Sequence, residues 1–309
     1  MKKIINLFFF GLLTVGLSSC LKDKSLTLPD ADGAIKNVIE FANPDFISSP
    51  VSSKYPVFVK SFDIAPTGNL TLTVNYAGVE AAPTDINIVV ALDPAILTAY
   101  NSKIVKDARD AAIELGEDPD DAEDDVHEEL FEALDPSLYT LGNLNLVIPS
   151  GQRTATLDLG LKPDQFSFTK NTALAFKIVS ASTGVVSGNF GSIIVKIGAK
   201  NSYDGTYTYT TSAITSLVPN ANKTVTLVTS SSTTVSLSPG LLGTYSNQVL
   251  YTIDKATNAV TVTCPSLGVQ TPQDTRSKYD PATKTMLVFW KQGNGNRTFE
   301  EKFVFKGPR

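Results

Sequence analysis

The sequence predicts a mainly β protein, in which an antiparallel β-sandwich with an inserted α-helical hairpin precedes a second antiparallel β-domain. Three observations predict this class. Short runs of β-branched and aromatic residues recur, separated by turn residues such as Pro66-Thr67-Gly68. Apolar residues change to helical spacing at about residues 94–134. The composition shifts to Thr, Ser and Tyr near Lys200-Asn201, which we take as a domain boundary.

The N-terminus has the form of a secretory signal. Two lysines precede the apolar run of residues 4–17, which is too short to span a bilayer. Two serines followed directly by Cys20 resemble the lipobox of bacterial lipoproteins, in which cleavage falls before a cysteine that then carries lipid. We therefore expect a signal peptide at 1–19 and a lipidated Cys20 that opens a flexible tether over 20–34. An ordinary signal peptide that contains a cysteine by chance is the alternative.

The first β-domain is expected over residues 35–200, because its short strands and turns are typical of an antiparallel sandwich. The predicted strands are 38–41, 56–59, 70–74, 86–90, 144–148, 154–159, 174–179 and 192–197. The second β-domain, 201–309, reads as sequential hairpins that close as a small barrel or sandwich. Its predicted strands are 203–211, 223–229, 233–237, 248–254, 259–264, 284–291 and 297–305, with hairpin turns at 254–258 and 293–296. In the last strand Phe299, Phe303 and Phe305 alternate and are expected in the core.

The insertion predicts a short helix over 94–101 and a second over 104–115 that ends at Gly116. A third helix begins with Asp118 as N-cap and proline at its first position, and it carries Leu134 on its apolar face. Eleven carboxylates and no Lys or Arg lie between residues 114 and 132. We interpret them as a solvated acidic face. A loose calcium site is the alternative, although the spacing of an EF-hand loop is absent.

Several functions are excluded by residues that the chain lacks. His127 is the one histidine and no GxSxG motif occurs, so a nucleophilic triad has little to be built from. One histidine and one free cysteine cannot close a zinc site. Cys264 alternates with two valines and is expected to be a buried, inert thiol, with a reactive thiol as the alternative. No basic patch with aromatic residues suggests nucleic acid. We expect no enzyme, metal or cofactor; a hydrolase with two facing carboxylates is the third interpretation.

The middle of the chain carries a set of short segments in a characteristic order. They are Ala99-Tyr100-Asn101, Leu134-Asp135-Pro136, Ile148-Pro149-Ser150-Gly151, Ile178-Val179-Ser180 and Lys200-Asn201-Ser202-Tyr203-Asp204-Gly205. Together they resemble the immunoglobulin-like N-terminal domain of uncharacterised Bacteroidota lipoproteins that are encoded beside polysaccharide-uptake systems. The C-terminal part, with Tyr279-Asp280-Pro281 and the hairpin of Trp290, is similar to the small β-domain often attached to it. The insertion over 103–132 is longer than in that family.

This resemblance implies an immunoglobulin-like sandwich and a lipoprotein anchored in the outer membrane at the cell surface, with the periplasmic face left open. It implies a non-catalytic protein that captures a polysaccharide or oligosaccharide. The implied neighbours are an outer-membrane transporter and its substrate-binding lipoprotein. The alternative is a structural or adhesive surface protein whose acidic hairpin contacts a protein partner.

A sugar site would need an exposed aromatic face flanked by polar groups. Trp290 lies beside amide and amine side chains near the last hairpin turn. The glycan-binding candidates are Trp290, Lys291, Gln292, Asn294, Tyr251 and Tyr279. However, Met286, Val288 and Trp290 share one strand face, which would place the ring in the core. An exposed Trp290 favours glycan binding; a buried Trp290 with an apolar patch on the hairpin favours the adhesive protein.

Overall fold

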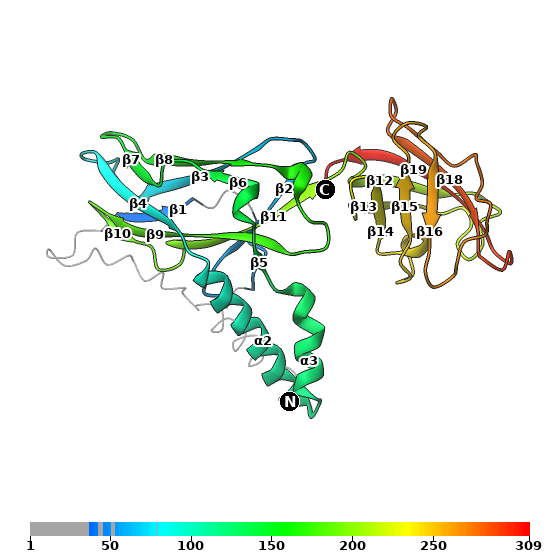
Figure 1. Cartoon of the computed structure of the whole chain (residues 1–309), viewed down its shortest axis with the longest axis horizontal. Coiled ribbons are helices and arrows are strands. Elements are labelled where there is room, and N and C mark those ends of the chain that lie inside the picture. The colour runs from blue at the N-terminus through cyan, green and yellow to red at the C-terminus, as the bar shows by residue number, and fades with distance from the viewer. Residues whose placement is uncertain (1–36, 43–45, 51–52, 79) are drawn as a thin grey trace, which may run out of the picture.

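The computed structural model describes residues 37–42, 46–50, 53–78 and 80–309 of the 309-residue chain. The predicted signal sequence, Cys20 and the tether lie outside these residues. Within them the chain is mainly β, as predicted, with a sandwich, a projecting pair of helices and a second sheet (Figure 1). No helix in the described ranges combines the length and apolar character needed to cross a membrane.

Two sheets form the sandwich. The first has the strand order β10-β1-β3-β8-β6 and the second β2-β11-β9-β4-β7, with β5 beside β9. Their bounds are β1 (Val38–Phe41), β2 (Val57–Asp63), β3 (Gly68–Ala77), β4 (Ile86–Leu92), β5 (Glu132–Ala133), β6 (Tyr139–Leu141), β7 (Asn145–Ile148), β8 (Thr154–Leu161), β9 (Thr172–Ala181), β10 (Val185–Val186) and β11 (Ser192–Lys200). Alternate residues such as Leu157 and Leu159 are buried between the sheets. Most pairs are antiparallel, but β2 with β11, β1 with β10 and β5 with β9 are parallel.

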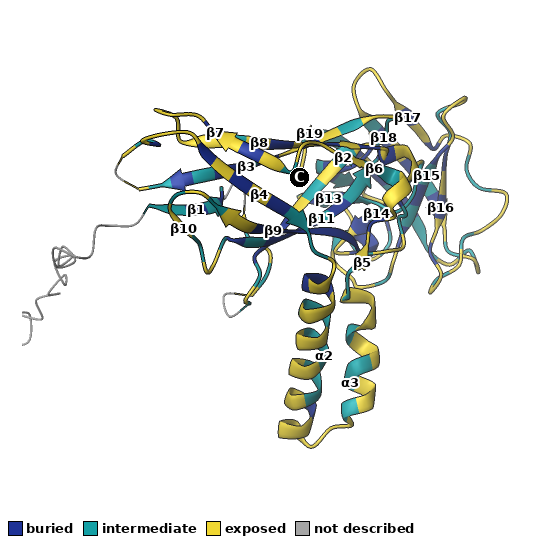
Figure 2. Cartoon of the chain, turned by 60° about the vertical axis from the view of Figure 1, so that its left-hand side comes forward, coloured by how far each residue is buried: buried dark blue, intermediate teal, exposed yellow. Residues whose placement is uncertain are grey.

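The insertion is a helical hairpin of α2 (Ala95–Leu115) and α3 (Pro119–Val126), followed by a 3₁₀ turn, η1 (His127–Glu129). The prediction of two short helices before Gly116 is wrong, because no breaker interrupts the 21-residue α2. Gly116 ends α2 with a left-handed φ of 74°, and Asp118 caps α3 by accepting from the backbone N–H of Asp120, both as predicted. The third helix ends before the predicted Leu134, which packs in the sandwich core instead. Figure 2 shows the hairpin standing away from the sheets.

The C-terminal sheet has the strand order β16-β15-β14-β13-β12-β19-β18-β17. Its bounds are β12 (Gly205–Thr211), β13 (Asn222–Thr229), β14 (Thr234–Ser238), β15 (Leu250–Ile253), β16 (Val260–Thr263), β17 (Lys278–Asp280), β18 (Thr285–Lys291) and β19 (Thr298–Gly307). Further 3₁₀ turns are η2 (Pro136–Leu138), η3 (Pro163–Gln165) and η4 (Leu241–Gly243). The outer strands β16 and β17 meet through a bridge between Ala259 and Lys278 and a Val260 N–H bond of 3.0 Å to the Ser277 carbonyl. The sheet is therefore nearly closed and barrel-like, which is one of the two forms, barrel or sandwich, that the sequence predicts.

Candidate functional site

Trp290 lies in the core of the C-terminal sheet. Its side chain is 3 % exposed, and its ring stacks on Phe299 with the centroids 4.1 Å apart. The indole N–H donates a 2.7 Å hydrogen bond to Oε1 of Glu301. No face of the ring is open to solvent, so the core alternative describes Trp290 and the prediction of an exposed stacking platform is wrong.

Glu301 is a buried carboxylate that the sequence analysis missed. Its Oε2 accepts hydrogen bonds from the hydroxyls of Tyr209 (2.6 Å) and Tyr251 (2.9 Å), while Trp290 occupies Oε1. Burial raises the pKa of the Glu301 carboxyl above its ordinary value, although the three donors oppose this rise. The signal was present, since Glu301 alternates in phase with Phe299 and Phe303, both in the core. These contacts form one closed polar network inside the sheet.

The other predicted glycan-binding residues do not lie together in one site. Tyr251 is fully buried against Glu301, and Tyr279 packs edge-on against Tyr203 at 4.8 Å in the core, so neither ring offers a face to a sugar. Gln292 and Asn294 belong to the β18–β19 turn, where Asn294 Oδ1 accepts from the backbone of Asn296 at 3.0 Å. Of the predicted polar residues, Lys291 alone lines a hollow that lies between β18–β19 and the loop joining β16 to β17.

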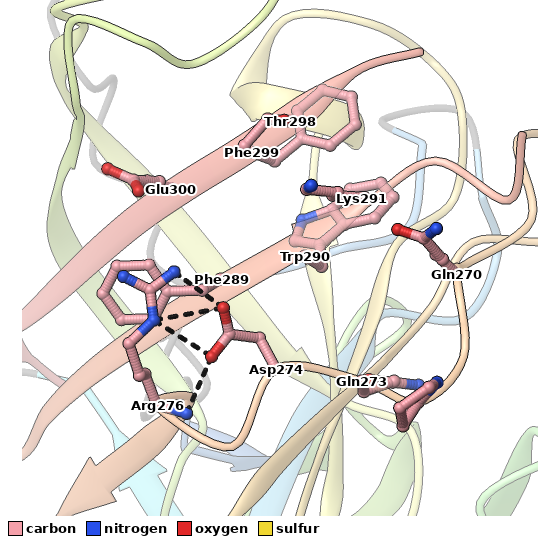
Figure 3. Close-up of a pocket in the computed structure, with 11 residues that line it drawn as sticks. Gln270, Gln273, Asp274, Arg276, Phe289, Trp290, Lys291, Thr298, Phe299 and Glu300 are labelled. Atoms are coloured by element: carbon pink, nitrogen blue, oxygen red, sulfur yellow. Dashed lines mark hydrogen bonds and ion pairs between the residues drawn. The ribbon is translucent and has the colours of Figure 1, made fainter. Parts of the chain in front are cut away.

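A hollow of about 240 Å³ lies between β18–β19 and the loop that joins β16 to β17 (Figure 3). It is lined by Gln270, Pro272, Gln273, Asp274, Arg276, Phe289, Trp290, Lys291, Thr298, Phe299 and Glu300. The loop is held in place by the Gln273 amide, which donates to the Val262 carbonyl at 2.9 Å and accepts from its N–H at 2.7 Å. The hollow therefore has fixed walls.

Arg276 and Phe289 form one wall of the hollow. Phe289 alternates with the buried Trp290 and is only half-buried, on the opposite face of β18. The guanidinium carbon of Arg276 lies 4.3 Å from the Phe289 ring centroid, a cation–π contact. Nη2 of Arg276 also forms a 2.6 Å ion pair with Asp274 Oδ2. The hydrogen bonds from Arg276 lower the pKa of the Asp274 carboxyl, so this carboxyl is poorly suited to act as a general acid.

Several polar groups of the hollow make no hydrogen bond or ion pair within the described part of the chain, although Glu300 interacts electrostatically with Arg276 and Lys291 with Asp274. They are Nη1 of Arg276, Nζ of Lys291, the side-chain amide of Gln270 and the carboxylate of Glu300, none of which makes a hydrogen bond or ion pair there. Arg276 and Lys291 can only donate, Glu300 can only accept, and Gln270 can do both. The site thus offers donors and acceptors side by side. Among the described residues no group of three or more metal-ligand side chains occurs.

The helical hairpin presents a second surface. Ile113 and Leu115 at the end of α2 are 63 % and 73 % exposed. A shallow hollow of about 580 Å³ runs between α2 and α3 and includes Ile113 and Leu130. Arg109 joins the helices through bonds to Asp120 (2.6 Å) and Glu123 (2.8 Å).

Two domain families match parts of the chain. Residues 205–307 match a domain of unknown function (DUF7015), and residues 43–185 match a family described as an N-terminal domain. No curated protein matches the chain.

Solved structures similar to this chain come from Bacteroides species. A Bacteroides ovatus protein of unknown function is 13 % identical with a TM-score of 0.49, and the alignment covers 87 % of this chain and 93 % of that chain. A Bacteroides ovatus multidomain protein including DUF1735 is 13 % identical (TM-score 0.48; 86 % and 92 % covered). A Bacteroides thetaiotaomicron auxiliary nutrient binding protein is 15 % identical (TM-score 0.42; 86 % and 93 % covered). Likeness this distant supports no functional argument.

Proposed function

We propose that this chain is a non-catalytic lipoprotein that binds glycan through the hollow beside Arg276 and Phe289. The observation that carries the proposal is the mixture of donors and acceptors that make no hydrogen bond to other described residues, placed around an aromatic wall. Each sugar hydroxyl both donates and accepts, so a glycan site needs both kinds of group, whereas an anion site needs donors alone. The contact between Arg276 and Phe289 fixes the guanidinium before a ligand arrives, which lowers the entropy cost of binding.

The cellular setting is part of the proposal and is supported by the sequence. The lipobox-like segment before Cys20 and the resemblance to polysaccharide-uptake lipoproteins support a lipid anchor in the outer membrane, at the cell surface. An outer-membrane transporter and its substrate-binding lipoprotein would be the partners. A small site binds weakly, and many anchored copies that engage one polysaccharide together would raise the overall avidity.

The test is calorimetric titration of the protein that begins at Leu21 with a panel of plant, host and microbial polysaccharides. We expect saturable binding to one class of glycan. Arg276→Ala should weaken it about tenfold or more, because a charge-assisted hydrogen bond is lost. Trp290→Ala is unsuitable as a probe, since it would open the core.

The matched control is Arg109→Ala, which removes an arginine with two carboxylate partners from the hairpin. Glycan affinity should not change in this variant. The proposal fails if no glycan in the panel binds, or if Arg276→Ala and Arg109→Ala bind equally well while both remain folded by circular dichroism.

A second candidate is a structural or adhesive protein that contacts a protein partner through the hairpin. The exposure of Ile113 and Leu115 on helices that stand away from the sheets favours it, as does the burial of Trp290. Cells that display the chain should then lose adhesion with Ile113→Ser and Leu115→Ser together, and keep it with Arg276→Ala. The reverse pattern would reject this candidate.

A further inference from the structure

We infer that the hollow holds one uncharged sugar residue at the end of a glycan chain, an inference that rests on the proposed function. The first argument is volume. The hollow measures about 240 Å³, below the range of about 300–1,000 Å³ that is usual for pockets of drug-sized ligands. There is room for a single sugar ring, whereas two consecutive rings would extend into solvent.

The second argument is closure along β18. At one end of the hollow the loop is tied to the strand by a bridge between Val269 and Gln292 and by a 2.9 Å bond from the Gln270 N–H to the Lys291 carbonyl. At the other end the Ser277 hydroxyl bonds both the N–H (2.9 Å) and the carbonyl (3.0 Å) of Phe289. A polysaccharide cannot pass along β18 through these ties. A glycan chain that lies along β18 can therefore enter only by its end or by a single-residue branch.

The third argument is charge. The lining contains two cations, Arg276 and Lys291, and two carboxylates, Asp274 and Glu300, so its formal charge is zero. Asp274 is already engaged with Arg276, and Glu300 is a second carboxylate in the lining that would repel the carboxylate of an acidic sugar. Because the lining carries no net charge, a net charge on the ligand does not increase the binding affinity. An uncharged sugar can bond to the groups that make no hydrogen bond to other described residues, and it leaves this balance of charge unchanged.

The experiment uses the same protein and defined probes. These are the methyl glycosides of glucose, galactose and mannose, those of glucuronic and galacturonic acid, and then the di- and trisaccharide of the preferred neutral sugar. We expect the oligosaccharides to match the monosaccharide within about twofold, because one ring makes all the contacts. The matching uronate should bind about fivefold more weakly, the upper range for a partly exposed charge pair. Binding of the neutral sugar should be insensitive to salt.

The charge argument has its own variant. Glu300→Gln should raise the affinity for the uronate relative to the neutral sugar by about fivefold, while Glu128→Gln on the hairpin should leave the ratio unchanged. An affinity that rises about tenfold or more from mono- to trisaccharide would require added subsites and would overturn the inference. So would tighter binding of the uronate by the unaltered chain. Either result leaves glycan binding intact, whereas silence of the whole polysaccharide panel rejects the proposed function itself.

Discussion

The two β-regions belong to one structural class but fill their interiors differently. The sandwich core is aliphatic and phenylalanine-rich, and Thr172 is its one buried polar residue in the described part of the chain. The C-terminal core instead contains five buried tyrosines, Trp290 and the carboxylate of Glu301. An apolar core has no directional bonds to satisfy, whereas a polar network requires specific distances between its members.

The position of this network explains why the difference matters. Trp290 donates to Glu301, and it is also among the residues that line the candidate hollow, although only 3 % of it is exposed. The interior network and the lining of the hollow thus share one residue, so the network that orders the core also fixes the strand beside the hollow. The sandwich has no equivalent arrangement among its described residues, and its distinctive addition, the hairpin, projects into solvent.

The largest expected effect comes from removing the acceptor at the centre of the network. Glu301→Ala should lower the free energy of unfolding of the C-terminal region by about 3 kcal/mol or more, because three donors lose their partner. Denaturation followed by Trp290 fluorescence reports on this region alone, since the chain has one tryptophan. The matched control is Glu300→Ala, which removes the neighbouring half-exposed carboxylate and should cost about 0.5 kcal/mol or less. Equal losses would show that the network contributes nothing special.

A smaller effect compares a tyrosine from each core. Tyr209→Phe removes one donor to Glu301 and should destabilise the C-terminal region by about 1.5 kcal/mol. Tyr76→Phe in the sandwich should cost about 0.5 kcal/mol or less, because the Tyr76 hydroxyl bonds no described residue. The sandwich lacks a strong fluorescent reporter, so Tyr76→Phe is followed by far-ultraviolet circular dichroism. If the two substitutions cost the same, the contrast between the cores is one of composition only.

The sequence predicted the parts of this molecule that depend on local patterns. Alternation located most strands within a few residues, and Asp118 and Gly116 placed the helix ends, because caps act over a single turn. The sequence patterns did not predict β5, β6, β10 and β17. These strands are two or three residues long and form only because adjacent strands pair with them. The parallel pairing of β2 with β11 is likewise a tertiary choice.

The candidate site shows the same limit. The polar neighbours of Trp290 in the sequence suggested an exposed ring, although its alternation with Met286 and Val288 indicated a position in the core. Phe289, one position earlier, faces the hollow. Arg276 and Asp274 belong to the loop that joins β16 to β17. The bridge between these two strands brings the loop to β18, and no spacing in the sequence predicts that contact.

The smallest and most specific prediction concerns pH. Burial raises the folded-state pKa of Glu301 above its ordinary value of 4.5, so the folded C-terminal region retains a proton that the unfolded chain releases. The stabilisation that this proton contributes is complete below about pH 4.5 and is lost as pH rises through the higher folded-state pKa. Glu301→Gln cannot titrate and should lack this part of the pH dependence. Exposed carboxyls such as Asp254 have lowered pKa values and act in the opposite direction, but they are common to both proteins. We therefore expect the unfolding free energy of the unaltered chain to fall steadily relative to that of Glu301→Gln as the pH is raised from 4 to 8. If this difference in unfolding free energy stayed constant with pH, the three hydrogen bonds would fully offset the cost of burying the charge, and Glu301 would be ionised in the core at no net cost.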